Sequence, residues 1–110
     1  MTYAKTTEFD ADIQEMAAYA KAMSHPARMA ILRFLAEQKQ CISGDISDHL
    51  PLSRTTVSQH LQELKRAGLI QGTVRGIKVN YCLNPVGIQK MKNLMGSFLE
   101  EIDIKDITCK

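Results

Sequence analysis

The stretch Leu52-Ser-Arg-Thr-Thr-Val-Ser-Gln-His-Leu-Gln-Glu-Leu-Lys-Arg-Ala-Gly-Leu-Ile70 decides the fold of this 110-residue chain. Its apolar side chains recur every three or four residues, which predicts the buried stripe of an amphipathic helix. Ser53 is suited to cap the start of that helix, and Gly68 to end it in a left-handed conformation. The predicted stripe comprises Val57, Leu61, Leu64 and Ala67.

The sequence before this helix predicts a second, shorter helix. It opens at Ser43-Gly44, with Asp45 near its positive end, and runs to about Leu50, where a proline ends it. The two helices are then joined by Pro51-Leu52-Ser53, a connection of helix-turn-helix length.

The period of the apolar residues changes from about 3.6 to 2 after Gly68, which predicts strands. Residues 69–74 form the first predicted strand and residues 77–83 the returning strand, with a turn at Arg75-Gly76. A hairpin directly after the second helix of a helix-turn-helix is the wing of a winged helix.

Helices are also predicted at both ends of the chain. A helix over residues 8–23 stops near Ser24-His25-Pro26, and another continues over residues 26–38. The last helix starts at Asn84-Pro85 and continues over residues 85–102. The fold class is mainly α with a small β-hairpin wing, a winged helix-turn-helix with about five helices. The buried side of the second helix comprises Ala27, Ile31, Phe34 and Leu35.

The composition excludes several classes of protein. With 110 residues and 45% hydrophobic content the chain is long enough for one packed domain, and its net charge of +2 alone says little about partners. The sequence has no run of about 20 apolar residues and no signal peptide, so we expect a cytoplasmic protein with no membrane partner. It also lacks a nucleophile elbow, a phosphate-binding glycine loop and paired carboxylates, so we expect no enzyme activity.

The outer side of the helix predicted after Ser53 carries side chains that read DNA. Amides pair with adenine, guanidinium groups with guanine, and hydroxyls with base edges or phosphates. A solvated surface helix with a capping box would explain Ser53, but not the absence of acidic residues before Glu63. We therefore favour a regulator that binds double-stranded DNA. The expected contacts are Ser53, Arg54, Thr55, Thr56, Ser58, Gln59, Gln62 and Lys65 on the helix and Arg75 and Lys78 on the wing.

Other interpretations of these residues stay open. Lys65 and Arg66 are also compatible with solvated cations near a helix end, and Arg75 and Lys78 with a simple polar turn. We interpret His60 as a partly buried histidine that bonds locally or to a phosphate, because no second metal ligand lies one turn away. The alternative function is a winged-helix protein-interaction module without DNA binding.

The first and last predicted helices have apolar stripes that the helix-turn-helix core does not use. Two subunits that pack these helices together would place two recognition helices one DNA turn apart, on an inverted repeat. The alternative is a terminal helix folded back over its own core. We expect residues 1–7 to be a disordered arm, residues 8–102 the DNA-binding domain with its dimerisation helices, and residues 103–110 a flexible tail. The expected dimer interface comprises Ile13, Met16, Ala20, Met91, Leu94, Met95 and Phe98.

These residues resemble the ArsR/SmtB family of winged-helix repressors, over nearly the whole chain from about Met16 to Met95. The stretch from residue 52 to residue 70 is similar to the family's recognition helix and the strand after it. Met23-Ser-His-Pro-Ala-Arg-Met-Ala-Ile-Leu32 is similar to the opening of its second helix. The resemblance implies a homodimer that represses its own operon and releases DNA when an inducer, often a thiophilic metal or metalloid, binds.

The residues at the family's best-known metal sites differ here. Arsenic and cadmium sensors place Cys-Val-Cys at the entrance of the helix-turn-helix, whereas this sequence has Cys41-Ile-Ser-Gly-Asp45, with one cysteine. Zinc sensors place Asp and His ligands along the last helix, and residues 85–102 contain no histidine. The inducer therefore stays unknown, and no cofactor is required for the fold.

The three cysteines permit three interpretations. Their odd number and wide spacing predict no structural disulfide framework. If Cys41-Ile42 is a short strand beside the strand that carries Cys82, the two sulfurs approach each other, and Cys109 on the tail completes a three-thiolate site for a thiophilic metal or metalloid. Cys41 and Cys82 are alternatively a redox pair, or small semi-buried hydrophobic residues.

Overall fold

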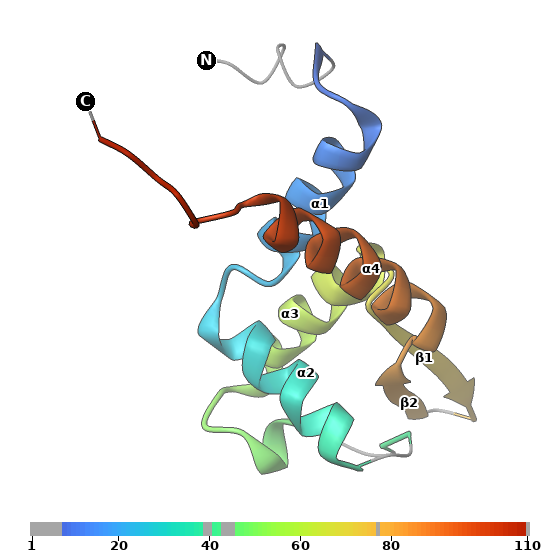
Figure 1. The fold of residues 1–110 in the computed structure, drawn as a ribbon. Coiled ribbons are helices and arrows are strands. Elements are labelled where there is room, and N and C mark those ends of the chain that lie inside the picture. The colour runs from blue at the N-terminus through green and yellow to red at the C-terminus, as the bar shows by residue number, and fades with distance from the viewer. Residues whose placement is uncertain (1–7, 39–40, 43–45, 77, 110) are drawn as a thin grey trace.

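The computed structural model describes residues 8–38, 41, 42, 46–76 and 78–109 (Figure 1). The elements in chain order are α1 (Ala11–Ala22), α2 (Pro26–Gln38), a 3-10 helix η2 (Ile46–His49), α3 (Arg54–Arg66), β1 (Ile70–Arg75), β2 (Lys78–Leu83) and α4 (Pro85–Glu101). This order confirms a mainly α fold with a β-hairpin wing. The arm predicted over residues 1–7 and the helix opening predicted at Ser43-Gly44 lie outside the described residues.

The hydrophobic core lies between α2, α3 and the start of β1. The stripe predicted for α3 is confirmed, since Val57, Leu61 and Leu64 are buried, and Ala67 is half-buried. α1 contributes only Tyr19 to this core besides an alanine. Each large apolar side chain that is fully buried stabilises the fold by about 1.5–3 kcal/mol. The core comprises Tyr19, Ala22, Ile31, Leu35, Ile46, Val57, Leu61, Leu64, Leu69 and Ile70.

The five predicted helical segments are all helical, but one of them is not an α-helix. The segment before α3 that the structure describes holds a single 3-10 turn, Ile46–His49, and not an α-helix. The Ile42–Tyr81 bridge lies before this segment and Pro51, which cannot continue a helix, follows it. The predicted first helix also begins later, at Ala11, with Gln14 donating to the Phe9 carbonyl at 2.7 Å.

The wing is an antiparallel hairpin whose register runs from Ile70 opposite Leu83 to Arg75 opposite Lys78. The predicted turn at Arg75-Gly76 is therefore one residue too early, because Arg75 still pairs in β1 and the positive φ of 63° falls on Gly76. On the other side of β2, Ile42 forms one bridge with Tyr81, through backbone hydrogen bonds of 2.7 and 3.0 Å. The short third strand is thus a single bridge.

The end of α3 and the start of α4 are held together by backbone contacts. Gly68 has a φ of 81°, which confirms the predicted left-handed stop of α3. The Asn84 side chain donates to the Gly68 carbonyl at 3.1 Å, and the Asn84 backbone N–H donates to the Leu69 carbonyl at 3.0 Å. In the first turn of α4, a Cβ added at Gly87 would overlap that same Gly68 carbonyl oxygen. α4 therefore starts in direct contact with the stop of α3.

Gly87→Ala is expected to destabilise the protein. Alanine favours a helix over glycine by about 1 kcal/mol, but the overlap with the Gly68 backbone forces α4 to shift, at a cost of about 1–3 kcal/mol. The matched control is Gly96→Ala in the same helix, where nothing lies within 4 Å and stability is expected to stay equal or rise. Urea denaturation followed by circular dichroism measures both. A Gly87→Ala variant as stable as wild type would contradict the close contact.

Candidate nucleic-acid interface

α3 is held by a cap at its start and by a buried side. The Ser53 hydroxyl accepts a hydrogen bond from the Thr56 backbone N–H at 3.2 Å, which confirms the predicted cap. The same hydroxyl donates to the Thr56 hydroxyl at 2.8 Å. With the apolar stripe buried against α2 and β1, the opposite side of α3 faces away from the protein.

The outward side of α3 carries most of the residues predicted to contact DNA. Thr56 is an exception, since it is half-buried and its hydroxyl is engaged by Ser53. The first acidic residue of the helix is Glu63, which forms an ion pair with Arg66 one turn on. The surface before Glu63 is therefore polar and free of carboxylates, as DNA contact requires. The exposed members are Ser53, Arg54, Thr55, Ser58, Gln59, Gln62 and Lys65.

The tip of the wing places two further predicted residues together. The hairpin register sets Arg75 opposite Lys78 as the last pair before the turn. Figure 1 shows the β1–β2 hairpin extending from the end of α3 to one side of the domain. The backbone thus brings two cationic residues to the end of the wing, and their contact with DNA stays a prediction.

His60 joins the buried side of α3 to α2. Its Nδ1 accepts a hydrogen bond from Arg28 Nε at 3.1 Å, and the Arg28 guanidinium also donates to the Ala22 carbonyl at 3.3 Å. The His25 ring lies 4.5 Å from the His60 ring, centroid to centroid. Burial of the ring, then the nearby charges of His25 and Arg28, lower the pKa of His60 below its ordinary value of 6.5. The neutral ring therefore bonds within the protein, as expected for a locally bonded histidine.

The sequence did not reveal the partner of His60. Arg28 lies 32 residues away on another helix, and no local spacing connects the two. The only signal was that both residues fall in the two stretches on which the family resemblance rests.

Two of the three cysteines are joined. Cys41, in the link after α2, and Cys82, in β2, form a disulfide with their Cα atoms 4.3 Å apart. The bridge between Ile42 and Tyr81 sets the residue before Ile42 beside the residue after Tyr81, which is the approach of the two sulfurs that the sequence predicted for a short strand at Cys41-Ile42. The bond itself differs from the expectation of no structural disulfide framework. Cys109 is an exposed free thiol on the tail. Within the described residues, no three His, Cys, Asp or Glu side chains are grouped so as to hold a metal ion.

The residues predicted to form a dimer interface fall into two groups. Met91, Leu94 and Met95 are half-buried and pack partly against the core of their own chain. Ile13 and Phe98 are 46% and 40% exposed, and so face solvent in a single chain. Met16 is half-buried, and Ala20 is exposed.

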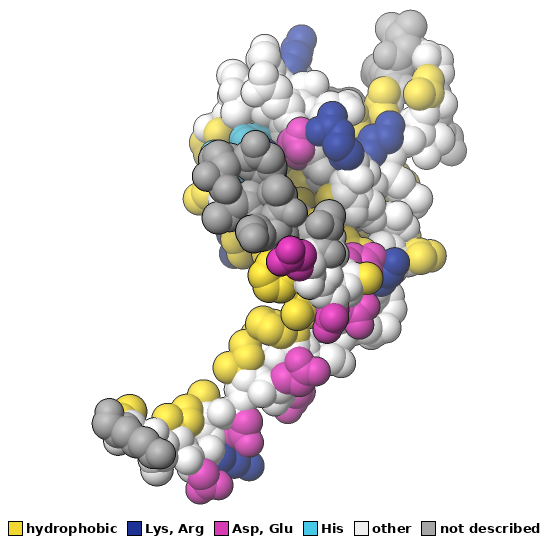
Figure 2. Space-filling model, turned by 90° about the horizontal axis from the view of Figure 1, so that it is seen from above, with side chains coloured by type: hydrophobic (Ala, Val, Ile, Leu, Met, Phe, Trp, Pro, Cys, Tyr) yellow, Lys and Arg dark blue, Asp and Glu magenta, His cyan; other side chains and the backbone are white. Residues whose placement is uncertain are grey.

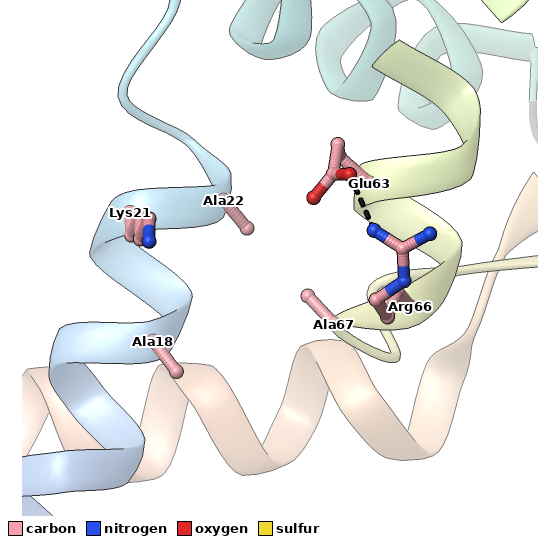
Figure 3. Close-up of a pocket in the computed structure, with 6 residues that line it drawn as sticks. All are labelled: Ala18, Lys21, Ala22, Glu63, Arg66 and Ala67. Carbon is pink, nitrogen blue, oxygen red and sulfur yellow. Dashed lines mark hydrogen bonds and ion pairs between the residues drawn. The ribbon is translucent and has the colours of Figure 1, made fainter. Parts of the chain in front are cut away.

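A shallow hollow of about 230 Å³ lies between α1 and α3 (Figure 3). The Glu63–Arg66 ion pair stands on its α3 side. Three of its six lining residues are alanine and the other three are charged, two of which are joined in the ion pair. The lining comprises Ala18, Lys21, Ala22, Glu63, Arg66 and Ala67.

Comparison with known proteins agrees with this geometry. Residues 23–73 match a helix-turn-helix domain family. The transcriptional repressor SdpR of Bacillus subtilis (strain 168) is 35% identical over 83 residues, which cover 76% of this chain and 91% of SdpR. The transcriptional activator HlyU of Vibrio cholerae is 33% identical over 75 residues, 68% of each chain.

Solved structures share the fold over most of the chain. HlyU from Vibrio cholerae superposes with a TM-score of 0.65 at 28% identity, covering 82% of this chain and 97% of HlyU. An ArsR-like transcriptional regulator from Rhodococcus sp. RHA1 superposes with a TM-score of 0.67 at 25% identity, covering 79% and 81% of the two chains. This chain belongs to the ArsR/SmtB family.

As an ArsR/SmtB-family protein, the chain is a DNA-binding transcriptional regulator. Its helix-turn-helix is η2, the turn at Pro51 and α3, and its wing is the β1–β2 hairpin. No helix in the described ranges is both long and apolar enough to cross a membrane. The relatives include a repressor and an activator, so family membership by itself does not give the direction of regulation.

The buried His60 makes stability depend on pH. Because its pKa is lower in the folded than in the unfolded protein, the unfolded state binds the proton more readily as the pH falls below 6.5. The free energy of unfolding of wild type is therefore expected to fall between about pH 7.5 and about pH 5.5. His60→Gln, which can still accept from Arg28 but does not titrate, should lose less stability over that interval.

The control is His49→Gln, which removes an exposed histidine that stacks on Phe34 at 5.1 Å. It should retain the wild-type dependence on pH. Urea midpoints at the two pH values give the comparison. Equal losses in wild type and His60→Gln would mean that burial and the neighbouring charges of His25 and Arg28 do not disfavour the charged form of His60 in the folded protein.

Proposed function

We propose that this regulator is a homodimeric repressor that binds an inverted-repeat operator through α3 and the wing. The observation that carries the proposal is the outward side of α3 from Arg54 to Gln62, which is exposed, polar and free of acidic residues. The similarity to the repressor SdpR over 91% of SdpR supports repression as the direction of regulation.

The side chains on the outward side of α3 fall into two groups, those that pair with base edges and those that contact phosphates. Gln59 and Gln62 carry amides that pair with the edge of adenine in the major groove, and Arg54 carries a guanidinium group that pairs with guanine. Ser58 and Thr55 suit phosphate oxygens, which fix register without reading sequence. α3 therefore combines sequence readout with positioning.

Exposed apolar side chains at the ends of the chain support a dimer. α4 has 17 residues and none is fully buried. Leu99 and Ile102 at its end are 65% and 54% exposed, and Phe9 before α1 is 56% exposed. Figure 2 shows hydrophobic side chains following the C-terminal segment outward from the domain, with Asp and Glu side chains along the same segment. Contiguous apolar surface of this kind marks an interaction site.

A second copy of the chain is the partner that fits this surface. α1 and α4 already contact each other, and Lys90 on α4 forms a 2.7 Å ion pair with Glu15 on α1. Packing this pair of helices on its symmetry mate would cover the exposed ends of both. A two-fold axis there would set the two α3 helices about 34 Å apart, one turn of DNA.

Gln59→Ala is expected to relax base preference in the operator. Loss of a bidentate contact costs about 1–3 kcal/mol of discrimination against a changed base. Gln89→Ala is the matched control, because Gln89 is an exposed glutamine on α4 whose amide donates within its own helix, to Asn93 at 2.9 Å. Fluorescence anisotropy on the native upstream region, a symmetrically mutated version and random duplex gives the specificity of each protein.

Arg75→Ala distinguishes a phosphate contact from base readout in the same assay. It should weaken binding to all sequences alike and reduce the slope of log affinity against log salt by about 1. Lys92→Ala, an exposed cation on α4, should leave that slope unchanged. If wild type binds the native region no better than random duplex at every salt concentration, specific regulation is excluded and a protein-interaction module becomes the better interpretation.

Phe98→Glu is expected to dissociate the dimer without unfolding the subunit. A charge placed unpaired in an apolar interface costs several kcal/mol, whereas Phe98 is already 40% exposed in one chain. Val86→Glu is the control, because Val86 is an apolar residue of the same helix that is 77% exposed at its other end. Sedimentation velocity at micromolar concentration reports the mass of each protein. A monomeric wild type, or a dimeric Phe98→Glu variant, would contradict this interface.

A further inference from the structure

The hollow between α1 and α3 has walls of methyl groups. Ala18 and Ala22 of α1 point into the space between the two helices, and Ala67 of α3 points into it from the other side (Figure 3). Larger apolar side chains at these positions would fill the gap, whereas the three methyl groups leave about 230 Å³ open. The hollow is therefore an apolar slot between two helices.

The charged residues of the lining come from both helices. Lys21 belongs to α1, and the Glu63–Arg66 ion pair belongs to α3. Arg66 donates to Glu63 through Nη1, so the other N–H groups of its guanidinium remain for a second acceptor. Among the residues that the structure describes, no carboxylate forms an ion pair with the Lys21 ammonium. Two cations and one carboxylate give the lining an excess of positive charge.

The volume of the hollow suits one aromatic ring that carries one charged group. An apolar cavity of about 150 Å³ binds a benzene molecule. The hollow is larger, at about 230 Å³, so it has room for a carboxylate beside the ring. Because the hollow is shallow, the charged group keeps contact with water while the ring covers the methyl groups.

We propose that this hollow binds a small aromatic carboxylate, with its ring between Ala18 and Ala67 and its carboxylate between Lys21 and Arg66. The carboxylate accepts charge-assisted hydrogen bonds from two cations on opposite walls. An ammonium ligand would face both cations, and the one carboxylate of the lining, Glu63, is already paired. A neutral ligand of the same size covers the same methyl groups but gains no charge-assisted bond.

The hollow lies between two helices with different proposed roles. α3 carries the residues proposed to contact DNA, and α1 carries part of the proposed dimer interface. A molecule in the hollow contacts both helices at once. Binding of the ligand itself does not depend on the proposed function, so it is measured without DNA.

The test uses sodium benzoate as the probe and the full-length, ¹⁵N-labelled protein. A titration followed by ¹H–¹⁵N correlation spectra should shift the amides of residues 18–22 and 63–67, with a dissociation constant of about 1 mM or lower. Benzyl alcohol keeps the ring without the charge, and acetate keeps the charge without the ring. Each should bind at least about threefold more weakly than benzoate.

Two pairs of variants locate the site. Ala18→Leu fills the hollow and should weaken benzoate binding at least about tenfold, whereas Ala17→Leu, an exposed neighbour on the same helix outside the lining, should bind like wild type. Lys21→Gln should weaken binding at least about threefold, and Lys92→Gln, an exposed cation on α4, should not change it. Circular dichroism checks that each variant is folded.

Three results would overturn the inference. The first is the absence of shifts in residues 18–22 and 63–67 of wild type at about 10 mM benzoate. The second is undiminished binding to Ala18→Leu or to Lys21→Gln. The third is binding to Phe98→Glu but not to wild type, which would mean that the second subunit of the dimer covers the hollow. None of these results bears on operator binding, and a protein that binds benzoate but not its operator overturns only the proposed function.

Discussion

The burial of the apolar stripe of α3 is the constraint on which the rest of this structure depends. Leu64 is completely buried, and Val57 and Leu61 are 2% and 5% exposed, all within reach of α2 and β1. Turning α3 about its axis would expose these side chains, each of which contributes about 1.5–3 kcal/mol. Several kcal/mol therefore hold the rotational position of the helix. The polar side reaches the surface as the consequence.

The helix-turn-helix is held at its entrance and at its exit by contacts with neighbouring elements. At its exit, the Gly68 carbonyl is contacted by Asn84 and by the first turn of α4 at Gly87. At its entrance, the backbone of Ile42 is paired with Tyr81 of the wing. Both junctions join the helix-turn-helix to the hairpin or to the helix after it. The two junctions therefore fix where α3 lies relative to the wing.

The small size of the core explains why α1 and α4 leave apolar surface exposed. α2, η2, α3 and β1 supply most of the buried residues, and a chain of 110 residues has little more interior to offer. α4 is consequently only half-covered along its length, and its C-terminal part lies outside the core. The dimer that we propose would use these uncovered helices, and a second subunit would double the number of recognition helices without enlarging the core.

The sequence by itself determined the features that depend on neighbours within a few residues. The cap at Ser53, the stop at Gly68 and the buried stripe between them follow from helical spacing, and the hairpin follows from its period of two. Tertiary structure decided what depends on distant partners. His60 meets Arg28 from 32 residues away, and the described part of the segment before α3 is a 3-10 turn where the sequence predicted a short helix. The sequence predicted the approach of Cys41 and Cys82 only on the condition that Ile42 pairs with the wing, and the core decided that this condition is met. Local periodicity carries no information about such pairs, since their positions are set only when the core brings the elements together.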